Sequence, residues 1–193
     1  MVVTSGVAAG IGHNNGPSMD AGVAWRTHCW TRARADLLPH LPIEILRNRV
    51  ARARDLGLDY RTYASVRAAS GHDVVAFLFS SNALRLRLRN VALPPDRAAR
   101  LASLTACGRT ALAQGRLDPA LILRANLDAL DACHPAPALL ASFQDARAAL
   151  RTAIGAHPRD GVILIGEGTL ERDWCAAGRL AGFVSADHYF RPV

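Results

Sequence analysis

Residues 73–89 read DVVAFLFSSNALRLRLR, and the fold depends on how this stretch is interpreted. The run at 74–79 is apolar at every position and therefore shows no periodicity. Such a run fits either a buried helix or a strand inside a covered sheet. We favour a helix, because a continuous helix would connect the run to Ala83 and Leu84. The alternative is a buried strand at 74–79, followed by a turn at 80–82.

Leucine and arginine then alternate strictly over 84–89. In an extended segment this alternation would place Arg85, Arg87 and Arg89 on one face, as in a short basic strand or wing. We favour the other interpretation, in which 84–89 is the basic end of the preceding helix. Arginine stabilises the negative end of a helix dipole.

The residues before this stretch predict two further helices joined by tight glycine turns. The first ends at Gly57, and the second covers 60–70, with Asp59 as its N-cap and Gly71 after its last turn. With a third helix at 74–79, the three would have the arrangement of helix-turn-helix modules. A helix as apolar as 74–79 cannot read base edges, so any contact with DNA would be made to phosphates by its neighbours.

Length and composition predict a folded globular protein, because the chain has 193 residues and half of them are hydrophobic. We expect a mainly α fold, a multi-helix domain with a small β element near 162–165. The alternative is an α+β fold in which 74–79 is a buried strand. Further helices are expected at 96–114, 118–134 and 139–154.

The chain divides into three predicted segments. Residues 1–19, which are rich in glycine, asparagine and small residues, are expected to form a flexible arm. Residues 20–92 form a basic helical subdomain that ends before a pair of prolines. Residues 96–193 form a helical unit that closes with a strand, a glycine turn and a helix between 162 and 180.

The positive charge is concentrated in the centre of the chain. Residues 32–100 carry 13 arginines against 6 acids, a net charge of +7, whereas the segments on either side are neutral. A local field of this kind attracts nucleic acid or an acidic protein. Each arginine that meets a phosphate releases counterions, which makes such binding depend on salt. The candidate contacts are Arg47, Arg49, Arg52, Arg54, Arg61, Arg67, Arg85, Arg87 and Arg89.

The glycine turn at 166–169 and the C-terminal tail form a second candidate site. A strand, a glycine turn and a helix can bind phosphate through backbone amides at the helix N-terminus. This turn lacks the spacing of known phosphate-binding loops, and its acidic residues would repel a phosphate. The candidate ligand contacts are Gly166, Gly168, Thr169 and His188.

No motif in the sequence specifies an enzyme reaction, a cofactor or a metal. The four cysteines are widely spaced and have no histidine at zinc-binding distance along the chain. We therefore expect no catalytic residues, no cofactor and no metal site.

We expect a non-enzymatic regulatory or adaptor protein that binds nucleic acid or an acidic partner through its basic centre. The alternative is a small enzyme or ligand-binding protein with its site at the glycine turn and the His188 tail. Nothing in the sequence reaches the length of a membrane span, so a cytoplasmic location is expected. A homo-oligomer is compatible with the sequence.

Overall fold

The apolar run at 74–79 belongs to a strand, so the preference for a helix there is wrong. In the computed structural model, which describes residues 41–191, this strand is the centre of a five-stranded parallel sheet. The fold is therefore α/β, and the prediction of a mainly α protein with one small β element is incorrect. The strands in spatial order are β3 (Ala132–Pro135), β2 (Gly108–Ala113), β1 (Ala76–Ser80), β4 (Val162–Gly166) and β5 (Gly182–Ser185).

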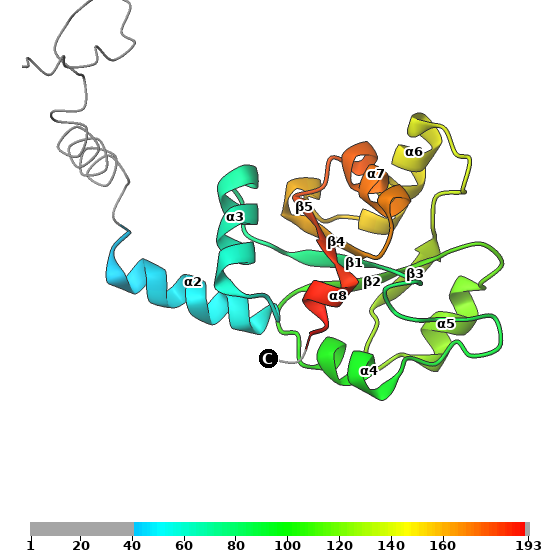
Figure 1. Cartoon of the computed structure of the whole chain (residues 1–193), viewed down its shortest axis with the longest axis horizontal. Helices are drawn as coiled ribbons and strands as arrows, with labels where there is room; N and C mark the ends of the chain where they lie inside the picture. The colour runs from blue at the N-terminus through cyan, green and yellow to red at the C-terminus, as the bar shows by residue number, and fades with distance from the viewer. Residues whose placement is uncertain (1–40, 192–193) are drawn as a thin grey trace, which may run out of the picture. The chain divides into compact units, whose positions relative to one another are not determined.

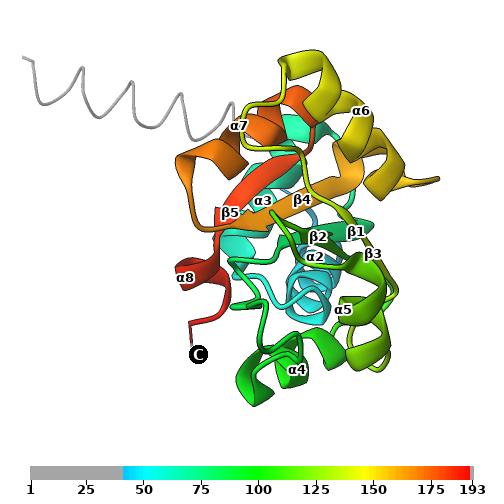
Figure 2. The ribbon, with the colours of Figure 1, turned by 90° about the vertical axis from the view of Figure 1, so that its right-hand side faces the viewer.

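Helices cover both faces of the sheet, which explains why β1 is apolar throughout (Figures 1 and 2). Phe77 and Phe79 enter the apolar core on one face, whereas Ala76 and Leu78 enter the core on the other. A parallel strand that is buried on both faces reads as a continuous apolar run, without the alternation of a half-exposed strand. The first face is covered by α2 (Ile43–Asp55), α3 (Tyr60–Ser70), α4 (Pro95–Ala102), α5 (Pro119–Ala125) and α8 (Ala186–Tyr189). The second face is covered by α6 (Phe143–Ile154) and α7 (Thr169–Gly178).

Two other strands lie in segments for which the sequence favours helices. The segment 96–114 contains the short helix α4 and then β2, and the segment 118–134 contains α5 and then β3. Alanine and leucine dominate β2, and both are strong helix formers. Pairing with the central strand overrides that local preference, because backbone hydrogen bonds and burial in the sheet depend on residues far away in the chain.

Several local signals predict the structure correctly. Helix α3 begins after Asp59, whose side chain accepts a hydrogen bond from the Thr62 amide. It ends at Gly71, which has the left-handed φ of 78°. The strand predicted near 162–165 is present as β4, and the helix after it is α7.

The leucine–arginine alternation at 84–89 forms neither a wing strand nor the end of a helix. The chain turns immediately after β1, and Arg85 has a φ of 57°. Arg87 and Asn90 then form an isolated antiparallel bridge. Leu84 and Leu86 are buried, which leaves the arginines between them on the surface.

The predicted arm at 1–19 and the start of the predicted 20–92 subdomain lie outside the described residues. Residues before and after Pro94 and Pro95 contribute to one sheet, since β1 pairs with both β2 and β4. Within residues 41–191, every helix is too short or too polar to span a bilayer.

Candidate functional site

The carboxyl ends of β1 and β4 meet at the point where the chain changes direction across the sheet. From β1 the chain proceeds to β2 and β3 on one side, and from β4 it proceeds to β5 on the other. This is the topological switch point of an open α/β sheet. The loops that leave the two strands here run in opposite directions, so a crevice is left between them. Asn82 follows β1 and Glu167 follows β4, so both lie at this edge.

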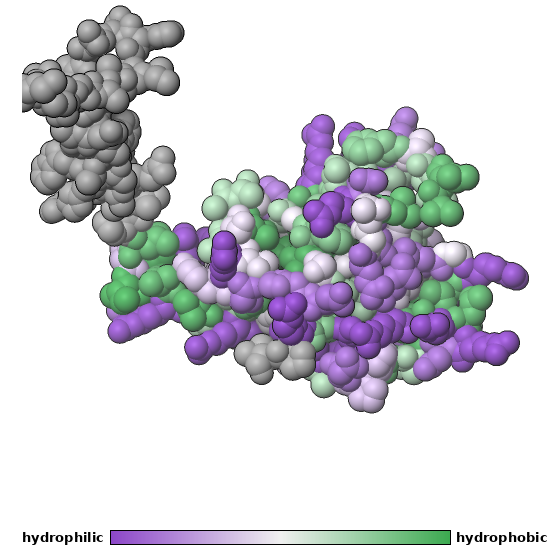
Figure 3. Space-filling view, in the orientation of Figure 1, coloured by the Kyte–Doolittle hydropathy of each residue, from purple (hydrophilic) through white to green (hydrophobic). Residues whose placement is uncertain are grey.

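A cavity of about 400 Å³ is present at this edge. We call it the switch-point crevice and define it by the residues that line it: Asn82, Arg85, Leu86, Arg87 and Glu167. All of these except Leu86 are polar and exposed. Figure 3 shows hydrophilic side chains over the part of the surface where α8 and the loop after β1 lie in Figure 1.

The loop after β1 holds the backbone of Arg85 in a strained conformation. The Arg85 amide donates to the carbonyl of Asn82 at 2.8 Å, and the Leu86 amide donates to that of Ser81 at 2.9 Å. The left-handed φ of Arg85 is unfavourable for a residue with a side chain. Backbone strain of this kind is often found at functional sites. The hydrogen-bonded turn maintains it here and directs Arg85 into the crevice.

Glu171 connects the loops behind the crevice. It is 1% exposed, and one carboxylate oxygen accepts hydrogen bonds from Asn82 Nδ2 at 3.1 Å and Gln114 Nε2 at 2.9 Å. The other oxygen accepts from the backbone amides of Glu167 and Gly168. One buried carboxylate therefore joins the ends of β1, β2 and β4, with every hydrogen bond assisted by its charge.

The glycine turn at 166–169 wraps around the Glu171 carboxylate. The amides of Glu167 and Gly168, which could bind an incoming anion, already donate to Glu171. Gly166 is buried, and a Cβ there would lie 2.5 Å from Glu171 Oε2, so only glycine fits. Gly168 and Thr169 are exposed at the start of α7. The turn thus positions the crevice wall, and two of its amides are already used by Glu171.

A buried arginine lies near the crevice. Arg97 is 3% exposed, and its guanidinium carbon is 3.7 Å from the centroid of the Phe190 ring. Its Nε is 3.6 Å from Asp96 Oδ2, and neither Nε nor Nη1 has a hydrogen-bond partner within residues 41–191. Burial lowers its pKa, as does the charge of Arg85, while the charge of Glu167 acts in the opposite direction. An arginine stays charged despite such shifts, so Arg97 adds positive potential near the crevice.

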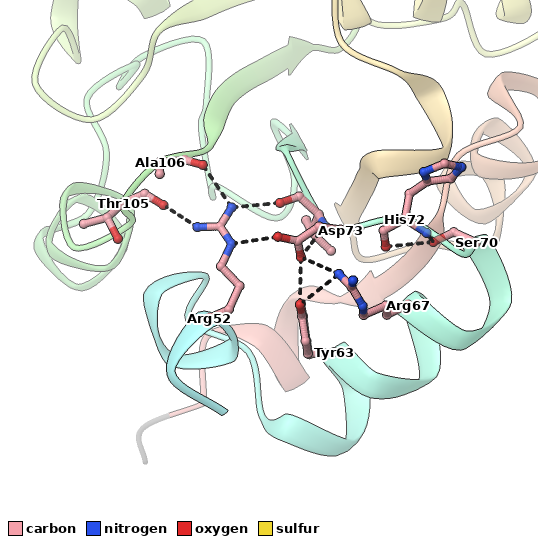
Figure 4. A network of polar contacts seen from close by, with 9 residues as sticks. Arg52, Tyr63, Arg67, Ser70, His72, Asp73, Thr105 and Ala106 are labelled. Atoms are coloured by element: carbon pink, nitrogen blue, oxygen red, sulfur yellow. Dashed lines mark hydrogen bonds and ion pairs between the residues drawn. The ribbon is translucent and has the colours of Figure 1, made fainter. Parts of the chain in front are cut away.

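Two of the nine predicted arginine contacts have a structural role. The Arg52 guanidinium donates to Asp73 Oδ2 at 3.2 Å and to the carbonyls of Val74, Thr105 and Ala106 at 2.9, 3.1 and 3.0 Å (Figure 4). Arg67 lies 3.5 Å from Asp73 Oδ1, which also accepts from the Tyr63 hydroxyl at 2.8 Å. These contacts fix α2 and α3 to the start of β1 and the loop before β2.

The other seven arginines separate into two groups. Arg85 and Arg87 line the switch-point crevice, and Arg89 is exposed beside them in sequence. Arg47 pairs with Glu44 at 3.1 Å on the exposed side of α2. The remaining members lie on α2 and α3, half-buried or exposed: Arg49, Arg54 and Arg61.

His188 belongs to a different place from the glycine turn. Its Nε2 is 2.9 Å from Asp59 Oδ2 and 3.2 Å from Thr62 Oγ1, and it lines a separate cavity of about 220 Å³ with Arg100. Burial opposes ionisation of Asp59, but hydrogen bonds from Thr62 and His188 outweigh it and lower the pKa of Asp59 to about 2. His188 does not line the switch-point crevice, and none of residues 166–169 lines the cavity beside His188.

Metal and thiol chemistry receive no support from residues 41–191. Within this range no group of three histidine, cysteine or acidic side chains could hold a metal ion. Cys107, Cys133 and Cys175 are free thiols, and burial raises the pKa of each, to about 11 for the last two. Thiols with raised pKa values are poor nucleophiles at neutral pH.

The comparisons with known proteins give no match: no protein family, no curated protein and no solved structure is similar to this chain. Sequence reasoning missed Gln114, Glu171 and Arg97. Glu171 lies three residues after the N-cap Gly168, where a glutamate side chain can accept from the N-cap amide, and this spacing is the signal in the sequence.

Proposed function

We propose that this protein binds a small anionic molecule in the switch-point crevice, with Arg85 and Arg87 as its charge contacts. The observation that carries the proposal is the position of two exposed guanidinium groups in a cavity of about 400 Å³ where β1 and β4 separate. Ligand pockets commonly measure roughly 300–1,000 Å³, so the crevice suits a small molecule.

The two sides of the crevice suggest the kind of ligand. Guanidinium groups bind carboxylate or phosphate oxygens through paired hydrogen bonds. Asn82 offers an amide, although its Nδ2 already donates to Glu171. Glu167 is exposed, and a carboxylate there can accept hydrogen bonds from hydroxyl or amino groups. A ligand with an anionic end and a hydroxylated or amino end fits both sides.

Thermal-shift measurements with a panel of small anions test this proposal. The panel contains inorganic phosphate, ribose 5-phosphate, adenosine monophosphate and succinate, and hits are followed by calorimetry. The R85Q/R87Q variant is expected to bind the best hit about 100-fold more weakly, about tenfold for each lost charge-assisted contact. The matched control is R116Q/R124Q, which removes the same charge from exposed positions elsewhere. Equal weakening in both variants would refute a specific site.

Nucleic acid, as a phosphate polyanion, is the second candidate for the same arginines. Arg85, Arg87 and Arg89 are all exposed on one short loop, where they can reach backbone phosphates as well as a small anion. Fluorescence anisotropy of a labelled random duplex at about 50 mM and about 200 mM salt tests this candidate. Tight binding that weakens steeply with salt, with a shallower slope in R85Q/R87Q/R89Q, would support it. Absence of binding at the lower salt concentration would reject it.

A further inference from the structure

A second basic cavity lies at the amino ends of the strands, opposite the switch-point crevice. It measures about 270 Å³ and lies beside the C-terminal ends of α6 and α7 and the segment that enters β4. We call it the α6–α7 cavity. Its charged and polar lining consists of Arg147, Arg151, His157 and Arg159, and the rest of the lining is apolar side chains and glycine.

The lining contains three arginines and a histidine but no acidic residue. Within residues 41–191, no carboxylate lies within ion-pair distance of Arg147, Arg151 or Arg159. The acid nearest in sequence, Asp160, instead contacts His72 Nε2 at 3.3 Å. These three arginines therefore keep their charge without an ion-pair partner among the described residues.

The helix ends do not cancel this charge. Each helix C-terminus carries roughly −0.5 of an elementary charge, so α6 and α7 together contribute about −1. Three arginines exceed that amount, and Arg147 already donates from Nε to the carbonyl of Ala177 at 3.2 Å. The net field inside the cavity stays positive.

Part of the lining is fixed before any ligand arrives. The Arg147 guanidinium is held by Ala177 and lies 5.4 Å from the centroid of the Phe143 ring. The ring of His157 packs against Gly108, where an added Cβ would lie 2.8 Å from His157 Nε2. Side chains that are already positioned lose less entropy on binding.

We infer that the α6–α7 cavity is a binding site for a small polyvalent phosphate, either free or as the phosphate end of a nucleotide. The absence of carboxylates selects for negative charge, and several guanidinium groups favour an ion that carries more than one charge. A volume near the lower limit of ligand pockets, roughly 300 Å³, suits a diphosphate group rather than a whole dinucleotide. This site is separate from the switch-point crevice and does not depend on the function proposed for it.

Calorimetry on the full-length chain tests the inference, with inorganic pyrophosphate and adenosine diphosphate as probes. The measurements use the R85Q/R87Q protein, so that the crevice does not contribute. Adding R151Q and R159Q, which change exposed side chains and leave the Arg147 contact intact, is expected to weaken pyrophosphate binding about 100-fold. Adding R116Q and R124Q instead is expected to change it by less than about twofold.

Equal weakening by the two added pairs would overturn the inference, because it would show a diffuse charge effect. Absence of pyrophosphate binding at about 50 mM salt would also overturn it. Binding of adenosine diphosphate as tight as that of pyrophosphate supports a phosphate-ester ligand, and binding of pyrophosphate alone supports the free ion. Failure of the crevice proposal would appear separately, as a panel of small anions that binds wild type and R85Q/R87Q equally.

Discussion

Replacing Glu171 with glutamine should destabilise the protein strongly, although the two side chains have almost the same shape. One carboxylate oxygen accepts from Asn82 and Gln114, and the other accepts from the amides of Glu167 and Gly168. Glutamine has one carbonyl oxygen and one amino group. In either orientation the amino group would face two donors.

The expected cost follows from those contacts. At least two hydrogen bonds to a charged group are lost, and each contributes about 1.5–3 kcal/mol. Two partly buried donors are also left without an acceptor, so E171Q should lower the free energy of unfolding by about 3–5 kcal/mol. For a protein of 193 residues this corresponds to a decrease in Tm of about 6–20 °C.

Urea denaturation followed by circular dichroism measures this change, with Tm from calorimetry as a second readout. The matched control is E167Q, because Glu167 is exposed and its side chain accepts no hydrogen bond from residues 41–191. E167Q should change stability by less than about 0.5 kcal/mol. A loss below about 1 kcal/mol in E171Q, or equal losses in the two variants, would refute the role of the buried carboxylate.

Three further predictions follow from the same contacts. G166A should lower the free energy of unfolding by about 1–3 kcal/mol, because a Cβ would collide with the buried Glu171 carboxylate. G168A should lower it by less than about 1 kcal/mol, because a Cβ there meets nothing within 4 Å. Similar losses in the two variants by urea denaturation would contradict the close packing of Gly166 against Glu171. R52Q should lower the free energy of unfolding by more than about 2 kcal/mol, because the Arg52 guanidinium donates to four acceptors. R54Q, on the exposed side of α2, should be nearly neutral, and the reverse order would contradict the structural role of Arg52. The pKa of Asp59 is lowered from 3.8 to about 2, so its contribution to stability is complete above about pH 4 and is lost as the pH falls through 2. In D59N the free energy of unfolding should therefore fall less steeply between about pH 4 and pH 2 than in wild type. The same steepness in both proteins would contradict the lowered pKa of Asp59.

The sequence predicted local features better than long-range ones. Three predicted features depend on neighbours in the chain, and all three are confirmed: Asp59 as the N-cap of α3, Gly71 at the end of α3, and the strand β4. The choice between helix and strand at 74–79 depends on which elements cover the two faces of this run, and those elements lie far away in the sequence. The short strands β2 and β3 are likewise stabilised by pairing rather than by their own residues.

The candidate site was predicted only in part for the same reason. Arg85, Arg87 and the glycine turn were identified from charge and glycine spacing, and the fold brings the arginines near Glu167. The hydrogen bonds of Glu171 to residues after β1 and β2 require the parallel sheet, which the mainly α prediction lacked. Position in the sequence places His188 with the turn, because both lie in the C-terminal region, but its side chain contacts Asp59 in the folded chain.

Mapping of amide chemical shifts in a titration with inorganic phosphate locates the proposed anion site residue by residue. An anion bound in the switch-point crevice should give concentration-dependent shifts at the amides of 82–90 and at Glu167 in wild type, and these shifts should be lost in R85Q/R87Q. The control R116Q/R124Q should retain them. Shifts that leave 82–90 and Glu167 unaffected, or that are identical in R85Q/R87Q and the control, would contradict an anion site in the switch-point crevice.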